Sequence, residues 1–79
     1  MSDNEIRENI QDAEQAFIGY ALSQLKLEDT GDNRERMLNV LNRYRALKIV
    51  SINDAGIIHY DDHEIMEPWA LRNALGLAS

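Results

Sequence analysis

The sequence lacks cysteine and contains little proline, glycine or tryptophan. Its 79 residues include no cysteine, one proline, four glycines and one tryptophan. Without thiols, the chain has no disulfide scaffold, no thiolate ligand for zinc and no cysteine nucleophile. Hydrophobic packing must therefore hold the fold, and we expect a reducing, cytoplasmic environment.

Long apolar runs and a basic leader are also missing. No apolar stretch approaches the ~18–20 residues that span a bilayer, and the first five residues, MSDNE, are acidic where a secretory signal is basic. We therefore expect neither export nor a membrane anchor. The length predicts one small domain over residues 1–79, whose limited core makes a partner or a second copy a natural source of extra stability.

The charge is acidic and unevenly distributed along the chain. The net charge is −6, and residues 1–33 carry eight acids against two bases. Residues 34–50 carry five bases against one acid, whereas residues 51–79 are acidic again. An acidic overall field repels phosphate, so general nucleic-acid binding is disfavoured and a basic partner is favoured.

Residues 2–25 are predicted to form the first helix. Their apolar side chains recur at steps of three and four, the period of an amphipathic helix. Ser2 and Glu5 have the capping-box spacing, and the wider apolar pattern after Ala16 predicts that the second half is the more buried. Three small residues share one face, which we expect to pack against another helix of the same chain, with a homodimer contact as the alternative: Ala16, Gly19 and Ser23.

A second helix is predicted from about residue 34 to residue 46 or 47, after a turn-rich segment in which Asp32 is the expected cap. Arg36 and Arg43 fall on one flank of its apolar stripe, and Arg34 and Arg45 fall on the opposite flank. This division argues against one continuous basic face. We expect these arginines to cover the edge of the core and to pair with acids of the first helix or of the C-terminal segment.

Residues 49–52 and 57–60 are β-branched segments around the turn sequence NDAG, and they predict a β-hairpin. Gly56 is suited to the left-handed position of a type I turn with a bulge. Pairing Ile52 with Ile57 makes both faces of the hairpin mostly apolar. One face would lie on the helices, and the other offers candidate oligomer contacts at Ile49, Ile58 and Tyr60.

Pro68 prevents one continuous helix through the C-terminal segment, so a turn followed by a helix from residue 68 to about 75 is predicted. Gly76 would end this helix. Its expected hydrophobic anchors are Trp69, Leu71, Leu75 and Leu77. The chain is therefore expected to adopt an α+β fold in the order α-α-β-β-α.

Catalytic and metal-binding signatures are weak. The segment from His59 to Glu64 contains five residues able to ligate a metal, but its spacing matches no strong metal motif, and its aspartates are simpler to interpret as helix caps. The hydroxyl residues lie in no nucleophile elbow, and there is no glycine-rich phosphate loop. We therefore expect no enzyme activity, no cofactor and no bound metal.

Two stretches of the sequence resemble a known group of proteins. Residues 14–21 (EQAFIGYA), followed by Leu25 and the segment GDN at 31–33, and residues 71–75 (LRNAL) faintly resemble the small biofilm and stress regulators of the YmgB/AriR type. Those regulators are helical and dimeric, so the resemblance implies a regulatory dimer. The predicted hairpin departs from that all-helical pattern.

The leading hypothesis is a small, acidic, non-enzymatic interaction protein of bacterial or phage type. It would bind and modulate or inhibit a basic protein that handles nucleic acid. The acidic surface would consist of Asp3, Glu5, Glu8, Asp12, Glu14, Glu28, Asp29 and Asp32.

The alternative is a homodimeric transcriptional, stress or biofilm regulator. It would use Arg36 and Arg43, or the hairpin, against DNA or a protein.

Overall fold

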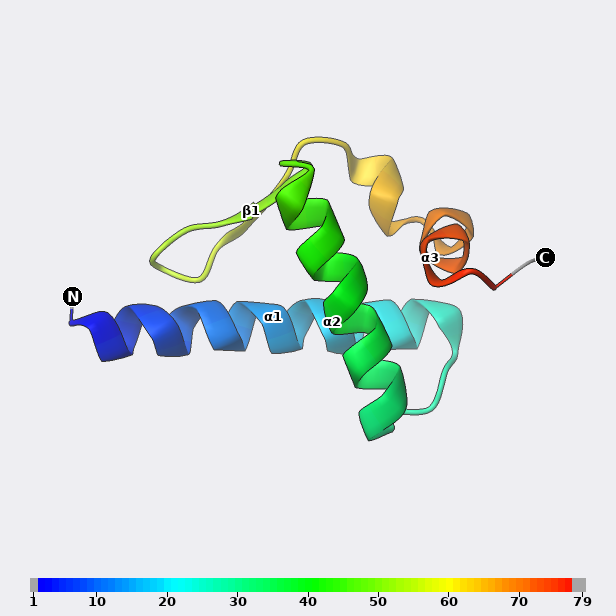
Figure 1. The fold of residues 1–79 in the computed structure, drawn as a ribbon, viewed down its shortest axis with the longest axis horizontal. Helices are drawn as coiled ribbons and strands as arrows, with labels where there is room; N and C mark the ends of the chain where they lie inside the picture. Colours follow the sequence, from blue (N-terminus) through cyan, green and yellow to red (C-terminus); the bar gives the residue numbers. More distant parts are fainter. Residues whose placement is uncertain (1, 78–79) are drawn as a thin grey trace.

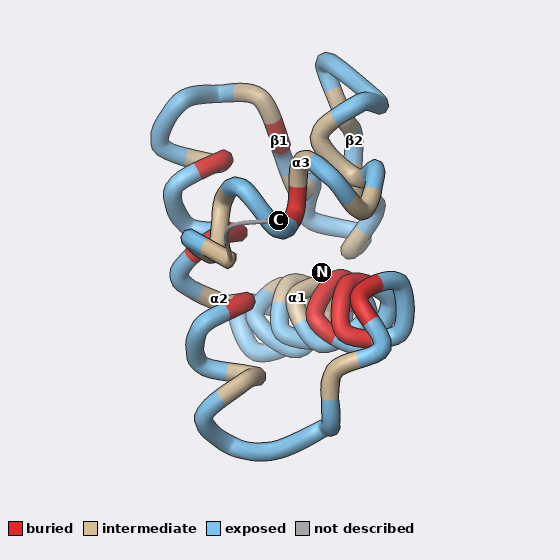
Figure 2. The backbone as a smooth tube through the Cα atoms, turned by 90° about the vertical axis from the view of Figure 1, so that its right-hand side faces the viewer, coloured by how far each residue is buried: buried red, intermediate tan, exposed pale blue. Residues whose placement is uncertain are grey.

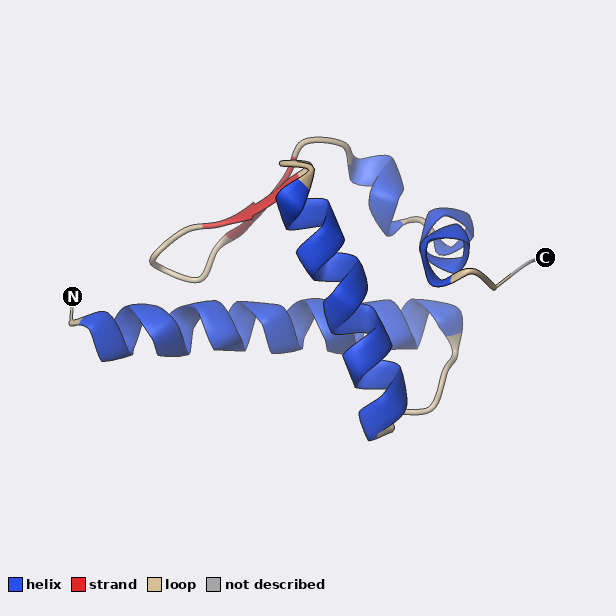
Figure 3. Ribbon diagram, in the orientation of Figure 1, coloured by secondary structure: helices blue, strands red, loops and turns tan. Residues whose placement is uncertain are grey.

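The computed structural model describes residues 2–77 and has the predicted order of elements. Helix α1 (Asp3–Leu25) is followed by α2 (Gly31–Ala46), the strands β1 (Val50–Ile52) and β2 (Ile58–Tyr60), and α3 (Pro68–Leu75) (Figures 1 and 3). A short 3-10 turn, η1 (His63–Met66), precedes α3. The predicted α+β fold in the order α-α-β-β-α is confirmed.

Helix α1 determines the elongated shape of the molecule. Its 23 residues are about 35 Å long at 1.5 Å per residue, and the whole fold extends 44 × 27 × 17 Å. The Ser2 hydroxyl accepts a hydrogen bond from the Glu5 backbone N–H at 3.3 Å, which is the predicted cap. At the other end, Lys26 adopts a left-handed conformation (φ 56°), and the Leu27 N–H donates to the Leu22 carbonyl at 3.0 Å.

The core lies where the second half of α1 meets α2 and α3 (Figures 1 and 2). Phe17 and Leu22 of α1 are buried there together with Leu41 of α2 and Leu71 of α3. In the first half of α1, Ala13 is the one buried residue. The prediction that the second half of α1 is the more buried is confirmed, and the first half protrudes from the packed centre.

The predicted packing of Ala16, Gly19 and Ser23 against another helix of the same chain is wrong. All three are exposed, and a Cβ built on Gly19 would have no neighbour within 4 Å. The small residues that face the other elements are instead Ala13 and Ala21, four residues before and after Phe17. Small residues occur on both the packed face and the exposed face of α1, so they do not identify the packed face. The larger apolar side chains do.

Helix α2 begins about three residues earlier than predicted and has a different cap. Thr30, not Asp32, is the N-cap, and its hydroxyl accepts from the Asn33 N–H at 3.2 Å. Asp32 lies inside the first turn of the helix, where its negative charge interacts favourably with the helix dipole. The segment offers several cap-forming residues, and the extended backbone of Thr30 decides between them.

The hairpin forms, but its predicted register is wrong by one residue. Ile52 pairs with Ile58, not with Ile57, and Val50 pairs with Tyr60. Gly56 occupies the left-handed position (φ 79°) of a turn closed by its N–H donating to the Asn53 carbonyl at 3.0 Å. The bulge at Gly56 uses one extra residue, so every later side chain of β2 moves to the opposite face.

This register gives the hairpin one apolar and one polar face. The side chains of Ile52, Ile58 and Tyr60 pack against the core, while Ser51 and His59 are exposed on the other face. The candidate oligomer contacts Ile58 and Tyr60, as well as Ile49, are therefore half-buried against the chain's own core. Among the large apolar residues of the hairpin, Ile57 is the one that stays exposed, at 63%.

The tip of the hairpin lies against the first half of α1 (Figure 1). The Asn9 side-chain amide donates to the Asp54 carbonyl at 3.0 Å. A Cβ built on Gly56 would lie 2.6 Å from the Asn9 carbonyl oxygen. Glycine is therefore required at position 56 both by the backbone conformation and by the closeness of α1.

The C-terminal segment folds as predicted, apart from its tryptophan. Pro68 begins α3, and Gly76 ends it in a left-handed conformation. Asp62 caps η1 by accepting the Glu64 N–H at 2.9 Å. Leu71 is fully buried, but Trp69 is 58% exposed, so Trp69 is not the anchor that was expected. Helix α3 has only eight residues, and only its side that faces α1 and α2 is covered by other elements. A side chain on its outer side, such as that of Trp69, therefore stays exposed.

Two glycine substitutions should have opposite effects on stability. We expect Gly56→Ala to destabilise the fold by about 1–2 kcal/mol or more, because a left-handed alanine is strained and its methyl group meets the Asn9 backbone. We expect Gly19→Ala to stabilise the fold by up to about 1 kcal/mol, because position 19 is an exposed helical site with open space around it. Urea unfolding followed by circular dichroism measures both changes. Equal stability of Gly56→Ala and the parent would contradict the docked hairpin.

Candidate functional site

Three acidic side chains share an outward face of α1, which we call the acidic face. Glu5, Glu8 and Asp12 are spaced by three and four residues, so they are neighbours on the helix surface. All three are exposed, and within residues 2–77 no ion pair involves any of them. The acidic face therefore carries uncompensated negative charge on the protruding half of α1.

The other five predicted acids lie elsewhere or are paired. Glu14 is 3.6 Å from Arg45 and is mostly covered. Asp29 is 2.9 Å from Arg34, whose guanidinium also donates to the side chain of Gln15. Asp3 is exposed in the first turn of α1, and Glu28 and Asp32 are exposed around the start of α2. The structure thus does not bring the eight acids into one surface.

The arginines of α2 mostly contact their own chain. Arg36 and Arg43 line the same shallow hollow, of about 170 Å³, beside Ala74 and Leu75, which confirms that they share a flank. Arg43 donates to the Ala74 carbonyl at 3.3 Å and so joins α2 to the end of α3. The expected pairing with an acid of α1 is confirmed for Arg45, which pairs with Glu14. Arg34 pairs instead with Asp29, in the loop between α1 and α2.

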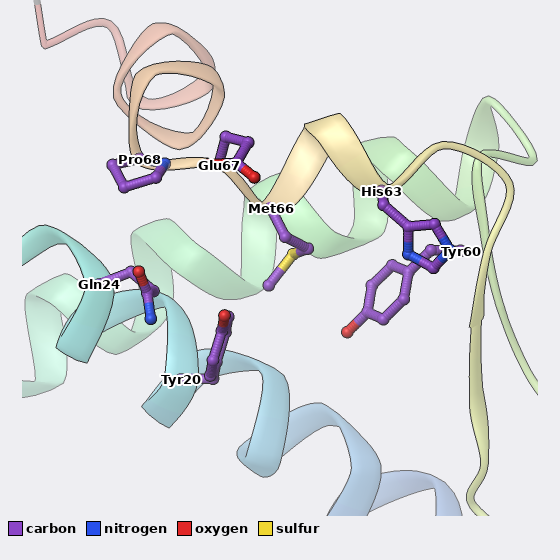
Figure 4. A pocket seen from close by; sticks show the side chains of 7 residues that line it. All are labelled: Tyr20, Gln24, Tyr60, His63, Met66, Glu67 and Pro68. Atoms are coloured by element: carbon purple, nitrogen blue, oxygen red, sulfur yellow. The ribbon is translucent and has the colours of Figure 1, made fainter.

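A larger groove, which the sequence did not predict, opens beside the core (Figure 4). Its volume is about 430 Å³, and it lies between the second half of α1, the end of β2, η1 and the start of α3. The side chains of Tyr20, Tyr60 and Met66 converge on its middle (Figure 4). The groove is lined by Tyr20, Gln24, Tyr60, His63, Met66, Glu67 and Pro68.

Aromatic and acidic groups dominate the chemistry of this groove. The rings of Tyr60 and His63 are tilted by 52° to each other, with their centroids 6.3 Å apart. Burial raises the pKa of the Tyr60 phenol, and the nearby Tyr20 raises that pKa further. The lining contains the Glu67 carboxylate but no lysine or arginine. The groove therefore offers ring faces and oxygen acceptors to a ligand, without a fixed positive charge.

Sequence reasoning missed the groove because its residues come from distant parts of the chain. Tyr20 and Tyr60 belong to different elements that meet only in the folded molecule. The hairpin register also matters, because the predicted pairing turned Tyr60 away from the helices. Tyr20 continues the apolar pattern of α1 in the sequence, and its 52% exposure becomes evident only in the folded structure.

The segment from His59 to Glu64 does not form a metal centre in the described structure. Within residues 2–77, no three His, Asp or Glu side chains are close enough to share an ion. Asp62 acts as the expected cap of η1, and His63 faces Tyr60. Each of these two side chains thus has a defined local role.

Comparison with known proteins gives no functional assignment. No family model matches the chain, and no curated protein or solved structure is significantly similar to it. None of the helices in the described part of the chain has the length and apolar content that crossing a bilayer requires. A functional proposal must therefore rest on the surfaces described above.

Alkaline pH should destabilise the fold through two tyrosines. Burial raises the pKa of Tyr44 and Tyr60 above the ordinary value of about 10, so the folded state holds their protons more tightly than the unfolded state. Their contribution to the unfolding free energy is complete below about pH 10 and is lost as pH rises through the folded-state pKa values.

The measurement is urea unfolding at a series of pH values between about 9 and 11.5, around the ordinary tyrosine pKa. The Tyr44→Phe/Tyr60→Phe variant should lose less stability over this range than the parent, because it has no buried phenol to ionise. Identical slopes for the two proteins would contradict the raised pKa values.

Proposed function

We propose that this chain is a small, non-enzymatic interaction protein that docks onto a basic partner through the acidic face of α1. The observation that supports the proposal most directly is the exposed, unpaired state of Glu5, Glu8 and Asp12. The partner class that fits is a protein with a lysine- or arginine-rich surface, such as one that handles nucleic acid. A negative surface of this kind speeds encounter and selects partners by charge.

The energetic cost of this arrangement supports a role in binding. Like charges three and four residues apart destabilise a helix by about 0.2–0.5 kcal/mol per pair, and the acidic face contains two such pairs, Glu5 with Glu8 and Glu8 with Asp12. The helix dipole compensates the charge only within the first turn, so Glu8 and Asp12 gain little from it. A basic partner would relieve this repulsion.

The dimeric regulator is less well supported by the structure. Arg34 and Arg45 pair with acids, and Arg43 has one of its donors on the Ala74 carbonyl, so within residues 2–77 Arg36 is the α2 arginine whose guanidinium is fully open to phosphate. The outward face of the hairpin carries Ser51 and His59 rather than a second apolar surface. The hairpin therefore gives the alternative little support, and its basic surface is reduced to Arg36 and Arg43.

The proposal predicts a strong effect of neutralising the acidic face. The probe is a fluorescently labelled octalysine peptide, and the measurement is its affinity by fluorescence anisotropy at low salt. We expect the variant Glu5→Gln/Glu8→Gln/Asp12→Asn to bind about tenfold or more weakly, since it removes three attractive charges from one surface. Binding by the parent protein should also weaken as salt is raised towards physiological ionic strength.

A matched variant separates local charge from net charge. The substitutions Glu35→Gln, Glu64→Gln and Asp61→Asn also remove three exposed acids, but from other parts of the surface. This control should lose much less affinity than the acidic-face variant. Equal losses in both would show that only the net charge matters, and the proposed contact surface would then be wrong.

A gel shift tests the regulator directly. We expect the parent protein to leave a DNA duplex unshifted at low salt, because its acidic field repels phosphate. A shift that disappears in the Arg36→Ala/Arg43→Ala variant would contradict the proposal and favour the regulator.

A further inference from the structure

The groove between α1 and η1 is built from two kinds of group. Apolar surface comes from the Tyr20 and Tyr60 rings and from Met66 and Pro68. Polar acceptors come from the two phenol oxygens, the Gln24 amide oxygen and the carboxylate of Glu67. Within the described structure the Glu67 side chain makes no hydrogen bond to cap α3, so it is available to a ligand.

This combination suits a ligand with an apolar stem and a cationic head. The faces of aromatic rings attract ammonium and guanidinium groups within about 6 Å, and lysine commonly lays its methylene stem along apolar surface. An anionic ligand would meet Glu67 and would find no lysine or arginine in the lining. Charge complementarity therefore selects a cation.

We propose that the groove lined by Tyr20, Tyr60 and Glu67 binds a lysine side chain of the basic partner. This inference rests on the proposed function and adds to it a specific recognition site. The stem of the lysine lies between Met66 and the tyrosine rings, and its ammonium group meets Glu67. The volume of the groove, about 430 Å³, accommodates one such side chain.

The position of the groove relative to the acidic face supports the same partner. Asp12, Ala16 and Tyr20 follow one another at steps of four along α1 and are all exposed. Asp12 and Tyr20 are thus separated by about 12 Å along the helix axis, the length of about four residues of extended peptide. The small side chain of Ala16 leaves this path open, so one basic segment can reach both the acidic face and the groove.

The experiment measures octalysine binding to four single variants of the full chain. Tyr20→Ala removes a ring and Glu67→Gln removes the charge, whereas Tyr20→Phe keeps the ring. Glu64→Gln is the matched control, because Glu64 is an exposed acid near the groove that does not line it. Tyr20 is half exposed on a helix and the Glu67 side chain forms no cap bond, so the variants should fold, which thermal unfolding checks.

We expect Tyr20→Ala and Glu67→Gln each to weaken octalysine binding about two- to fivefold, the effect of losing one cation–π or charge contact at a partly exposed site. Tyr20→Phe and Glu64→Gln should bind nearly as the parent does. In the parent, the peptide should also shift the ring proton resonances of Tyr20 and Tyr60 in NMR spectra, whereas an octaglutamine peptide should not.

The outcomes separate this inference from the proposed function. If Tyr20→Ala and Glu67→Gln bind like their controls while the acidic-face variant loses affinity, the groove inference is wrong and the proposed function stands. If the groove variants lose affinity while the acidic-face variant binds like the parent, the groove is the lysine site and the acidic face is not the contact surface. Unchanged affinity in all variants overturns both.

Discussion

The packing of the second half of α1 against α2 and α3 is the constraint on which the rest of the structure depends. Phe17, Leu22, Leu41 and Leu71 lie almost entirely out of water there, and burying side chains of this size contributes about 1.5–3 kcal/mol each. Because the core uses only one end of a long helix, the other end is left projecting and is free to carry like charges. The same packing places Tyr20 at the edge of the core, beside the groove.

Local chemistry explains why much of the fold could be predicted from the sequence. Apolar spacing identified the helices, and Ser2, Pro68 and Gly76 indicated three of their ends. The features that were not predicted depend on a choice between neighbouring residues that could each play the same role. Thr30 and Asp32 are both good caps, and only the backbone geometry selects Thr30.

The hairpin register shows how a small local error changes a surface. The turn with its bulge was expected at Gly56, but the pairing drawn from it omitted the extra residue that the bulge uses. The error turned Ile58 and Tyr60 outward and produced an apolar surface that the structure does not have. It also concealed the groove, since Tyr60 forms one of its walls. Likewise, the sequence shows which residues are acidic, but only the tertiary contacts of Glu14 and Asp29 show which acids are paired with an arginine.

The contact between Asn9 and the loop at Asp54 couples two parts of the molecule that look independent. The first turns of α1 lie outside the core, and an isolated two-stranded hairpin is marginally stable at best, so each is held partly by the other. Fraying of one should therefore release the other as a single cooperative opening. Ser51 and His59 form the pair of the hairpin whose amides bond across the strands, given its register and the flanking bonds at Asn53 and Asp61. Hydrogen exchange of these two amides would then report on binding at the outward face of α1, because a partner that holds the helix also makes the shared opening rarer.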